Sequence, residues 1–541
     1  MKYKTANYLL LLVIFILLYY LSYNYQDILA PAYLISGDIK NFGSSFDYHV
    51  HSQMLTLLPI SLYPLVYLGF SVSVISKFVT AFFSMLYLLG ITYFFRPYEK
   101  NTLIRTFLGV SFLAATYFSI PTLYSFDIIR TASTGGFVGT ILASVSLLYT
   151  QNRGRFPYYL SLITFLLHPV LGIYSLIILF LTELFCCHKN ATALLNKFFI
   201  CCLTIPLFFG LKFTFSILLP LESLKSGEGL YTDIVKNWDI HRVFVSYYSS
   251  EFIAVLISFI FSLFKIMNKK KNMSKNIALI FTTSSFYIFS TLAYNHFSGY
   301  LPGSFTSMMP QRFSLFPIFL ITLYILSEIH KKYGRGATFF SLLIPILLNI
   351  VAYLGLINFE LLSYLKVIYI LICLFTLRIN ISFKKRNISW IIIGLCLLMS
   401  TIFYKLKYRV FILPEQVTEE VKLDGNVLSC SSCYSVAVLY KFSNLINLNE
   451  VDTISYIPGV SLYFSSVFKD IYEVNYDEVN VGKGYQFYID QSYEQRLWES
   501  RKKKQWKELS VKYKIKGILV PAHWRLNLPS KDLGNFKLYL L

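Results

Sequence analysis

Charged side chains are scarce in this sequence. Only 14% of its 541 residues are Asp, Glu, Lys or Arg, whereas 55% are hydrophobic. A soluble domain of ordinary composition carries roughly 25% charged residues. The composition therefore excludes an ordinary soluble enzyme. The length suffices for about a dozen membrane-spanning helices and one modest soluble domain.

Acidic residues are the scarcer of the two charge signs. The chain has 49 Lys and Arg against 28 Asp and Glu, which gives a formal net charge of +21. An excess of this kind can indicate nucleic-acid binding. Here, however, the cations stand mostly in short loops between apolar runs, the pattern that sets the orientation of membrane helices. We therefore expect membrane lipids, and no nucleic acid, as partners of the basic residues.

Cysteine is also rare, with 8 residues in the chain. Most of them lie in apolar runs, where we interpret them as packing residues. Cys430 and Cys433 differ, because they form a C-x-x-C pair in a polar segment near the C-terminus. The chain has no second C-x-x-C pair of the kind that a zinc ribbon requires. An oxidising compartment would favour a small structural disulfide between Cys430 and Cys433.

Apolar runs of helix length fill the first 406 residues. They cover about 7–25, 54–70, 75–95, 103–120, 134–150, 157–187, 198–218, 250–267, 276–294, 313–329, 337–356, 361–378 and 388–406. The loops richest in Lys and Arg, at 269–271, 330–335 and 384–386, should face the cytoplasm. The first run has the layout of a signal peptide, but we interpret it as an uncleaved helix, because Pro31 stands in the only cleavage-like site.

Two of these runs conflict with the expected sidedness. Run 157–187 separates basic residues that both belong inside, so we predict a helical hairpin bent at His168-Pro169, where proline lacks the N–H that a helix needs. Run 54–70 contains Pro59 and Pro64, and we predict that it is re-entrant or lies on the membrane surface. These assignments give about 13 spans, with the N-terminus inside and the C-terminus outside.

The last part of the chain changes character. Strand-like pieces at Asn426–Ser429, Thr453–Tyr456, Gly517–Pro521 and Phe536–Leu540 alternate with helical pieces at about 434–443 and 493–513. This alternation predicts a small α/β domain. We therefore expect an α-helical polytopic membrane domain over 1–406, with a first outer loop at 26–74. A soluble extracytoplasmic α/β domain would follow over 407–541.

The first outer loop carries two acids, Asp38 and Asp47. A carboxylate there can accept the proton of a sugar hydroxyl that attacks an anomeric carbon; ordinary loop solvation is the alternative. We take Asp38 as the first choice for this base, because it follows Gly37 soon after the first helix, and Asp47 as the second choice. Asp47, His49 and His51 stand at alternate positions. On an extended chain they would line one face and form a candidate site for a divalent metal ion.

Cations at the expected outer ends of helices are candidates for binding a lipid phosphate. Arg130 and Arg312 can each donate paired N–H groups to a phosphate or pyrophosphate, and contact with lipid headgroups alone is the alternative. Lys212, within a span, is a weaker candidate of the same kind. His168, at the predicted bend, would orient a phosphate or hydroxyl, with a purely structural histidine as the alternative.

This layout resembles the GT-C superfamily of membrane glycosyltransferases, in its acid-bearing first outer loop, its many spans and its soluble outer C-terminal domain. Three stretches resemble bacterial relatives of that architecture: Arg130-Thr131-Ala132-Ser133, His168-Pro169-Val170-Leu171-Gly172 and Pro310-Gln311-Arg312-Phe313-Ser314. The tail Trp506–Pro521 looks like their closing helix-and-strand unit. The family's first loop often has a tighter acidic signature, whereas Asp38 and Asp47 stand nine residues apart.

The resemblance implies an enzyme of the bacterial cytoplasmic (inner) membrane. It would transfer a sugar from a polyprenyl-phosphate-linked donor to a surface glycan or lipid acceptor outside the cytoplasm. The alternatives are an O-antigen or capsule polysaccharide polymerase acting on polyprenyl-pyrophosphate glycans, and a lipid-linked glycan transporter or flippase. Such polymerases usually lack a separate C-terminal α/β domain. A transporter should carry acid–base pairs deep in its spans, whereas Glu183 is the main acid within a span here.

Overall fold

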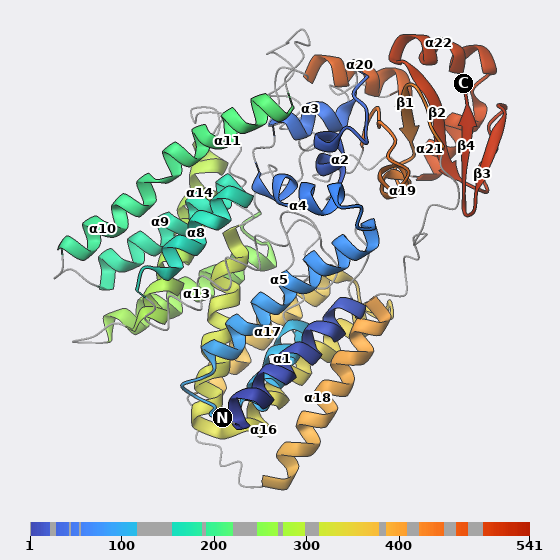
Figure 1. Ribbon diagram of the computed structural model, residues 1–541. Helices are drawn as coiled ribbons and strands as arrows, with labels where there is room; N and C mark the ends of the chain where they lie inside the picture. Colours follow the sequence, from blue (N-terminus) through green and yellow to red (C-terminus); the bar gives the residue numbers. More distant parts are fainter. Residues whose placement is uncertain are drawn as a thin grey trace. The chain divides into compact units, whose positions relative to one another are not determined.

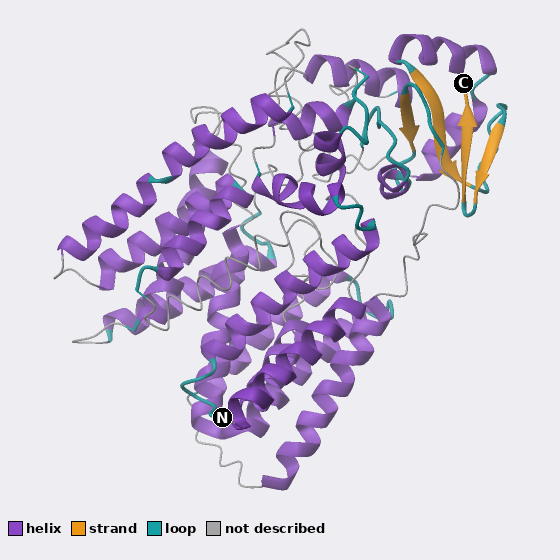
Figure 2. Cartoon of the chain, in the orientation of Figure 1, coloured by secondary structure: helices purple, strands orange, loops and turns teal. Residues whose placement is uncertain are grey.

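The structure is a computed structural model of the full chain. It describes residues 2–21, 29–42, 45–53, 56–115, 154–186, 191–219, 246–268, 274–297, 313–377, 386–407, 421–447, 461–473 and 491–541. These residues form mostly α-helices, together with one small sheet near the C-terminus (Figures 1 and 2). The chain divides into two compact units. The first comprises Met1–Tyr23, Phe78–Pro206 and Phe244–Ile412, and the second Asn24–Lys77, Leu207–Val243 and Leu413–Leu541.

The first unit is built from helices alone in its described part. These are α1 (Lys2–Leu21), α6 (Thr102–Ala115), α8 (Phe156–Leu167), α9 (Pro169–Cys186), α10 (Ala191–Cys202), α13 (Ser250–Met267), α14 (Lys275–Phe297), α16 (Leu315–Tyr353), α17 (Phe359–Thr376) and α18 (Arg386–Lys407). Two further helices, α5 (Val72–Phe94) and α11 (Thr204–Leu218), run across the boundary between the units.

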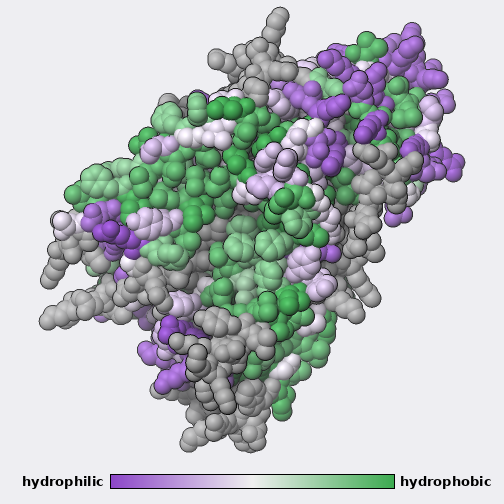
Figure 3. Space-filling model, in the orientation of Figure 1, coloured by the Kyte–Doolittle hydropathy of each residue, from purple (hydrophilic) through white to green (hydrophobic). Residues whose placement is uncertain are grey.

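Among the described residues, 6 helical segments are long and apolar enough to cross a membrane: Val72–Phe94, Pro169–Cys186, Leu194–Leu218, Ser250–Met267, Lys275–Phe297 and Leu315–Tyr353. Large apolar side chains such as Phe213 and Phe375 are exposed on these and shorter helices. On the face drawn in Figure 3, hydrophobic residues cover much of the helical part, and hydrophilic residues gather over the C-terminal elements and in smaller groups elsewhere. An exposed apolar surface of this extent fits contact with lipid.

The chain therefore has the helix lengths and surface of an α-helical membrane protein. The expected total of about 13 spans stays a prediction, because the described residues include 6 candidate spans. Run 134–150, which we predict to be a span, lies outside the described residues.

The long element α16 consists of two helices. Gly334 interrupts it with non-helical angles of φ 80° and ψ −170°. An unbroken helix of 39 residues would be about 59 Å long, roughly twice the thickness of the hydrocarbon core. The break falls at the basic stretch 330–335, so the two halves correspond to the separate runs at 313–329 and 337–356.

The predicted hairpin at His168-Pro169 is confirmed. α8 ends at Leu167 and α9 begins at Pro169, and His168 between them is extended, with φ −155° and ψ 97°. The two helices approach closely, because a Cβ atom on Gly172 would lie 2.1 Å from the Cα atom of Phe165. Only glycine fits at this position. Within the stretch His168–Gly172, Gly172 therefore allows α8 and α9 to pack closely at the bend.

Run 54–70 forms the short helix α4 (Leu57–Tyr67) in the second unit. Its 11 residues extend over about 17 Å, roughly half the hydrocarbon core of a bilayer. α4 is thus too short to cross a membrane by itself, which is the property that our prediction of a non-spanning segment requires.

The C-terminal part of the second unit contains a mixed four-stranded sheet in the order β1-β2-β4-β3. β1 (Asn426–Ser429) pairs parallel with β2 (Ile515–Pro521), whereas β4 (Phe536–Leu540) is antiparallel to both β2 and β3 (Ser530–Leu533). A parallel pair requires a crossover connection. The chain between β1 and β2 supplies it with α19 (Tyr434–Leu439), α20 (Ser461–Tyr472), α21 (Gln491–Ser500) and α22 (Lys503–Tyr513).

The predicted small α/β arrangement is thus confirmed in kind, with differences in its elements. The single helix that we predict over 493–513 is wrong, because α21 ends at Ser500 and α22 begins at Lys503. The Gln505 side chain accepts the backbone N–H of Lys502 at 2.8 Å and so begins a new helix there. The sequence did not predict α20 and β3, and the predicted strand Thr453–Tyr456 lies outside the described residues.

Candidate functional site

The second unit combines part of the expected outer loop 26–74 with the expected C-terminal domain. α2 (Ala30–Ser36) and α3 (Phe46–Gln53) belong to it. The backbone N–H of Phe46 donates to the carbonyl oxygen of Asn444 at 3.2 Å, and the Ser45 hydroxyl donates to the same oxygen at 3.2 Å. The Phe46 ring also meets the Phe464 ring edge-on, with centroids 4.8 Å apart. The segment around α3 and the C-terminal elements therefore pack against each other.

Asp38 lines an open pocket of about 630 Å³ within this unit. α2 ends at Ser36, and Gly37, with φ 76°, reverses the chain while the N–H of Ile39 donates to the Tyr33 carbonyl at 3.1 Å. A left-handed turn of this kind favours glycine. The turn presents the Asp38 carboxylate to solvent, with its side chain 38% exposed.

We call this cavity the Asp38 pocket, and its lining also contains lysines. Lys40, Lys422 and Lys441 line it, so three cations face one anion. Lys441 Nζ lies 3.2 Å from Asp38 Oδ2 and 5.1 Å from the centre of the Tyr33 ring. A concave surface with excess positive charge attracts anionic ligands. The Asp38 pocket can therefore hold an anionic group beside an accessible carboxylate.

Tyr33 stays protonated in this environment. Burial, and secondly the negative charge of Asp38, raise the pKa of its hydroxyl above the ordinary value of a tyrosine. Tyr33 is thus a neutral neighbour of the Asp38–Lys441 ion pair at ordinary pH. The sequence offered no signal for Lys441, because it is a single lysine in a distant segment without a diagnostic spacing.

Asp47 occupies a different environment. It is fully buried, and the hydroxyl of Tyr434 donates to its Oδ1 at 3.0 Å. A carboxylate enclosed in this way does not reach a sugar hydroxyl in this conformation. Its hydrogen bond instead links α3 to the first residue of α19. Of the two acids, Asp38 is therefore the more accessible to solvent.

The extended chain that we expect for the metal site at Asp47, His49 and His51 is wrong, because residues 46–53 form helix α3. In a helix with 3.6 residues per turn, side chains two positions apart point to nearly opposite faces. Within the described ranges, no group of three or more His, Cys, Asp or Glu could hold a metal ion. Burial lowers the pKa of His51 to about 4, so this histidine is neutral at ordinary pH.

The other predicted ligands lie in several parts of the chain. His168 lies in the first unit, where its Nδ1 accepts the N–H of Leu171 at 3.5 Å and caps the first turn of α9. Lys212 is exposed on α11 in the second unit and is not among the residues that line the pocket. Arg130 and Arg312 lie outside the described residues, so their phosphate contacts stay predictions.

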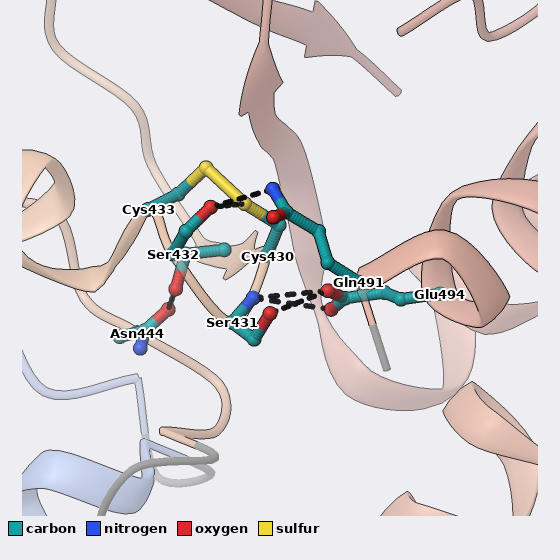
Figure 4. The surroundings of a disulfide bond; sticks show 8 residues. Cys430, Ser431, Ser432, Cys433, Asn444, Gln491 and Glu494 are labelled. Atoms are coloured by element: carbon teal, nitrogen blue, oxygen red, sulfur yellow. Dashed lines mark hydrogen bonds between the residues drawn. A yellow bond between two sulfur atoms is a disulfide. The ribbon is translucent and has the colours of Figure 1, made fainter. Parts of the chain in front are cut away.

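Cys430 and Cys433, the pair singled out in the sequence, are joined by a disulfide between β1 and α19 (Figure 4). The loop between the cysteines is held by α21. The backbone N–H and the hydroxyl of Ser431 both donate to the carboxyl of Glu494, the hydroxyl at 2.8 Å. The side-chain amide of Gln491 donates to the Ser432 hydroxyl at 3.0 Å.

Glu494 is a buried titratable group that the sequence did not indicate. Burial raises its pKa to about 7, and the hydrogen bonds from Ser431 oppose this effect only in part. The carboxyl is therefore half protonated near neutral pH. The sequence did not indicate that Glu494 is buried, because its neighbours Gln491, Tyr493 and Gln495 have the polar pattern of a solvent-exposed helix.

No protein-family model matches the chain, and a comparison with curated proteins finds no match either. The expected membership of the GT-C superfamily therefore depends on layout and short motifs.

Proposed function

We propose that the chain is a GT-C-type membrane glycosyltransferase. It would transfer a sugar from a polyprenyl-phosphate-linked donor to a surface glycan or lipid acceptor, on the outer side of the bacterial cytoplasmic membrane. The observation that carries the proposal is the Asp38 pocket, in which an accessible carboxylate stands beside three lysines. Its volume of about 630 Å³ falls within the range of small-molecule sites.

Glycosyl transfer from a phosphate carrier requires an anion site and a base. In the proposed reaction the acceptor oxygen attacks the anomeric carbon, and its proton passes to Asp38. The bond between the anomeric carbon and the phosphate oxygen breaks, and its electron pair stays on the polyprenyl phosphate. Lys40 and Lys422 would stabilise this leaving group through their positive charge.

Lys441 would have two functions in this scheme. In the absence of substrate it pairs with Asp38, at 3.2 Å. When a donor phosphate enters, its ammonium group would turn to the phosphate and leave the carboxylate available to the acceptor hydroxyl. Arg130 and Arg312 keep their expected roles in holding the donor phosphate. Asp47 is not part of the proposed reaction, because it is fully buried.

The transporter alternative has less support. Glu183, the main acid within a span, forms an ion pair with Lys197. Glu183 lies within one turn of the end of α9 at Cys186, whereas coupling sites of transporters lie near the bilayer midplane.

A reconstituted assay tests the proposal. The purified chain in lipid nanodiscs is mixed with polyprenyl-phosphate sugars and glycan acceptors, and the products are followed by mass spectrometry. Asp38→Asn should lower turnover by about 100-fold or more while donor binding persists, because only proton transfer is lost. Asp532→Asn, an exposed acid on β3, is the matched control. Wild-type turnover in Asp38→Asn would rule out Asp38 as the base.

A further inference from the structure

A second open pocket, of about 790 Å³, lies within the first unit between α13, α16 and α17. We call it the basic groove, after Lys265, Lys331 and Lys332, which line it. It shares no residue with the Asp38 pocket, and its interpretation does not depend on glycosyl transfer.

The three lysines gather at one end of the helices. Lys265 is in the last turn of α13, and Lys331 and Lys332 stand within one turn before the break of α16 at Gly334. Lys332 Nζ donates to the carbonyl oxygen of Leu377, just past the end of α17, at 2.8 Å. With Glu328 as its only acid, the described lining has a formal excess of two positive charges.

The walls of the groove are apolar and exposed. Ile260 and Phe264 of α13 are 56% and 52% exposed, and Phe375 of α17 is 67% exposed. The lining of α13 begins at Ile257, eight residues before Lys265 and thus about 12 Å along the helix axis. This distance lies within one leaflet, about half of the roughly 30 Å hydrocarbon core. The groove thus has a cationic end and an apolar length, which match the two parts of an anionic amphiphile.

We propose that the basic groove binds an anionic diacyl phospholipid of the surrounding bilayer. Its phosphate would lie among Lys265, Lys331 and Lys332, and its acyl chains would cover Ile260, Phe264 and Phe375. Basic pockets between membrane helices have this preference because their lysines attract a negative headgroup. A zwitterionic lipid fills the same apolar walls but brings no net charge, so the groove discriminates between headgroups.

The test uses the full-length protein, delipidated in mild detergent and titrated with phosphatidylglycerol or with phosphatidylcholine of identical acyl chains. Native mass spectrometry counts the bound lipids and gives their affinities. The wild-type chain should bind phosphatidylglycerol about tenfold more tightly than phosphatidylcholine at low salt. The double variant Lys265→Gln/Lys331→Gln should lose this preference. Lys332 is left unchanged because it also binds the end of α17.

The matched control is Lys100→Gln/Arg155→Gln, which removes the same charge from two exposed positions of the first unit outside the groove. It should keep the wild-type preference. Phosphatidylglycerol with six-carbon chains and inorganic phosphate should both bind more weakly, because they cannot cover the apolar walls.

Equal affinity of the two long-chain lipids for the wild type would overturn the proposal. An unchanged preference in the double variant, or equal binding of inorganic phosphate, would overturn it as well. The single variants Lys265→Gln and Lys331→Gln, each expected to lose part of the preference, replace the double variant if that protein does not fold.

Discussion

Replacing Glu494 by glutamine should remove a pH dependence from the stability of the C-terminal α/β elements. Burial raises the pKa of this carboxyl from 4.5 to about 7, so between these values the folded chain holds a proton that the unfolded chain releases. The resulting stabilisation is fully present below pH 4.5 and is lost as pH rises through 7. The difference between the two pKa values corresponds to about 3 kcal/mol.

Tryptophan emission can follow this effect in the full-length protein. Trp498, Trp506 and Trp524 are fully buried among these elements, and the chain has only 5 tryptophans. Urea titrations at about pH 5 and about pH 8 compare the wild type with Glu494→Gln, because the opposite contribution of His51, whose pKa burial lowers to about 4, is the same in both chains. Glu494→Gln, which keeps a neutral side chain, should exceed the wild type in stability at the higher pH, and this advantage should largely disappear at the lower pH, where Glu494 is protonated as well.

Glu508→Gln on α22 is the control, because it makes the same change at an exposed position. Asp470 does not interfere with this measurement. Burial raises the pKa of its carboxyl, but the hydrogen bonds from Lys512 and Tyr513 lower it by more, so the pKa lies below 3.8. Its contribution is lost only as pH falls below the window of the experiment. An unchanged pH dependence in Glu494→Gln relative to the wild type would refute the reasoning.

Three further predictions concern the helices. Gly172→Ala should lower the free energy of unfolding by about 1–3 kcal/mol, and with it the thermal unfolding midpoint, because its Cβ would lie 2.1 Å from the Phe165 backbone. Gly210→Ala, whose Cβ would have nothing within 4 Å, should leave the midpoint unchanged. Glu99→Gln should destabilise the first unit by about 1 kcal/mol in a thermal unfolding assay, because it weakens a two-bond contact with Arg335, which is 42% exposed and partly screened. Reporter fusions after residues 25, 72 and 541 should report the outside and a fusion after 100 the inside; a cytoplasmic signal at 541 would contradict the proposed sidedness.

The sequence predicts those features of the fold that arise from local chemistry. Pro169 predicted the break between α8 and α9, because a residue without an N–H interrupts the helix whatever surrounds it. The basic stretch around Gly334 likewise marked the break within α16. Apolar length alone could not place the ends of the helices. The sequence also merged α21 with α22, because their interruption at Arg501-Lys502 carries neither proline nor glycine.

The candidate site depends on contacts that the sequence does not reveal. Alternation at Asp47, His49 and His51 suggested an extended chain, whereas the packing of Phe46 against Phe464 accompanies a helix there. Ser45 meets Asn444 across a separation of 399 residues, and no local pattern predicts such a pair. Lys441 could be assigned to the Asp38 pocket only after the two distant segments were seen together.

The identity of the base is the central claim, and cells provide its most direct test. Surface glycans and lipid-linked intermediates are measured by mass spectrometry in cells with the wild-type gene, without the gene, and with Asp38→Asn at matched protein abundance. We expect the last two to lose the same sugar from the surface glycan and to accumulate the same polyprenyl-phosphate-linked donor. Wild-type glycans in the Asp38→Asn cells would contradict the account.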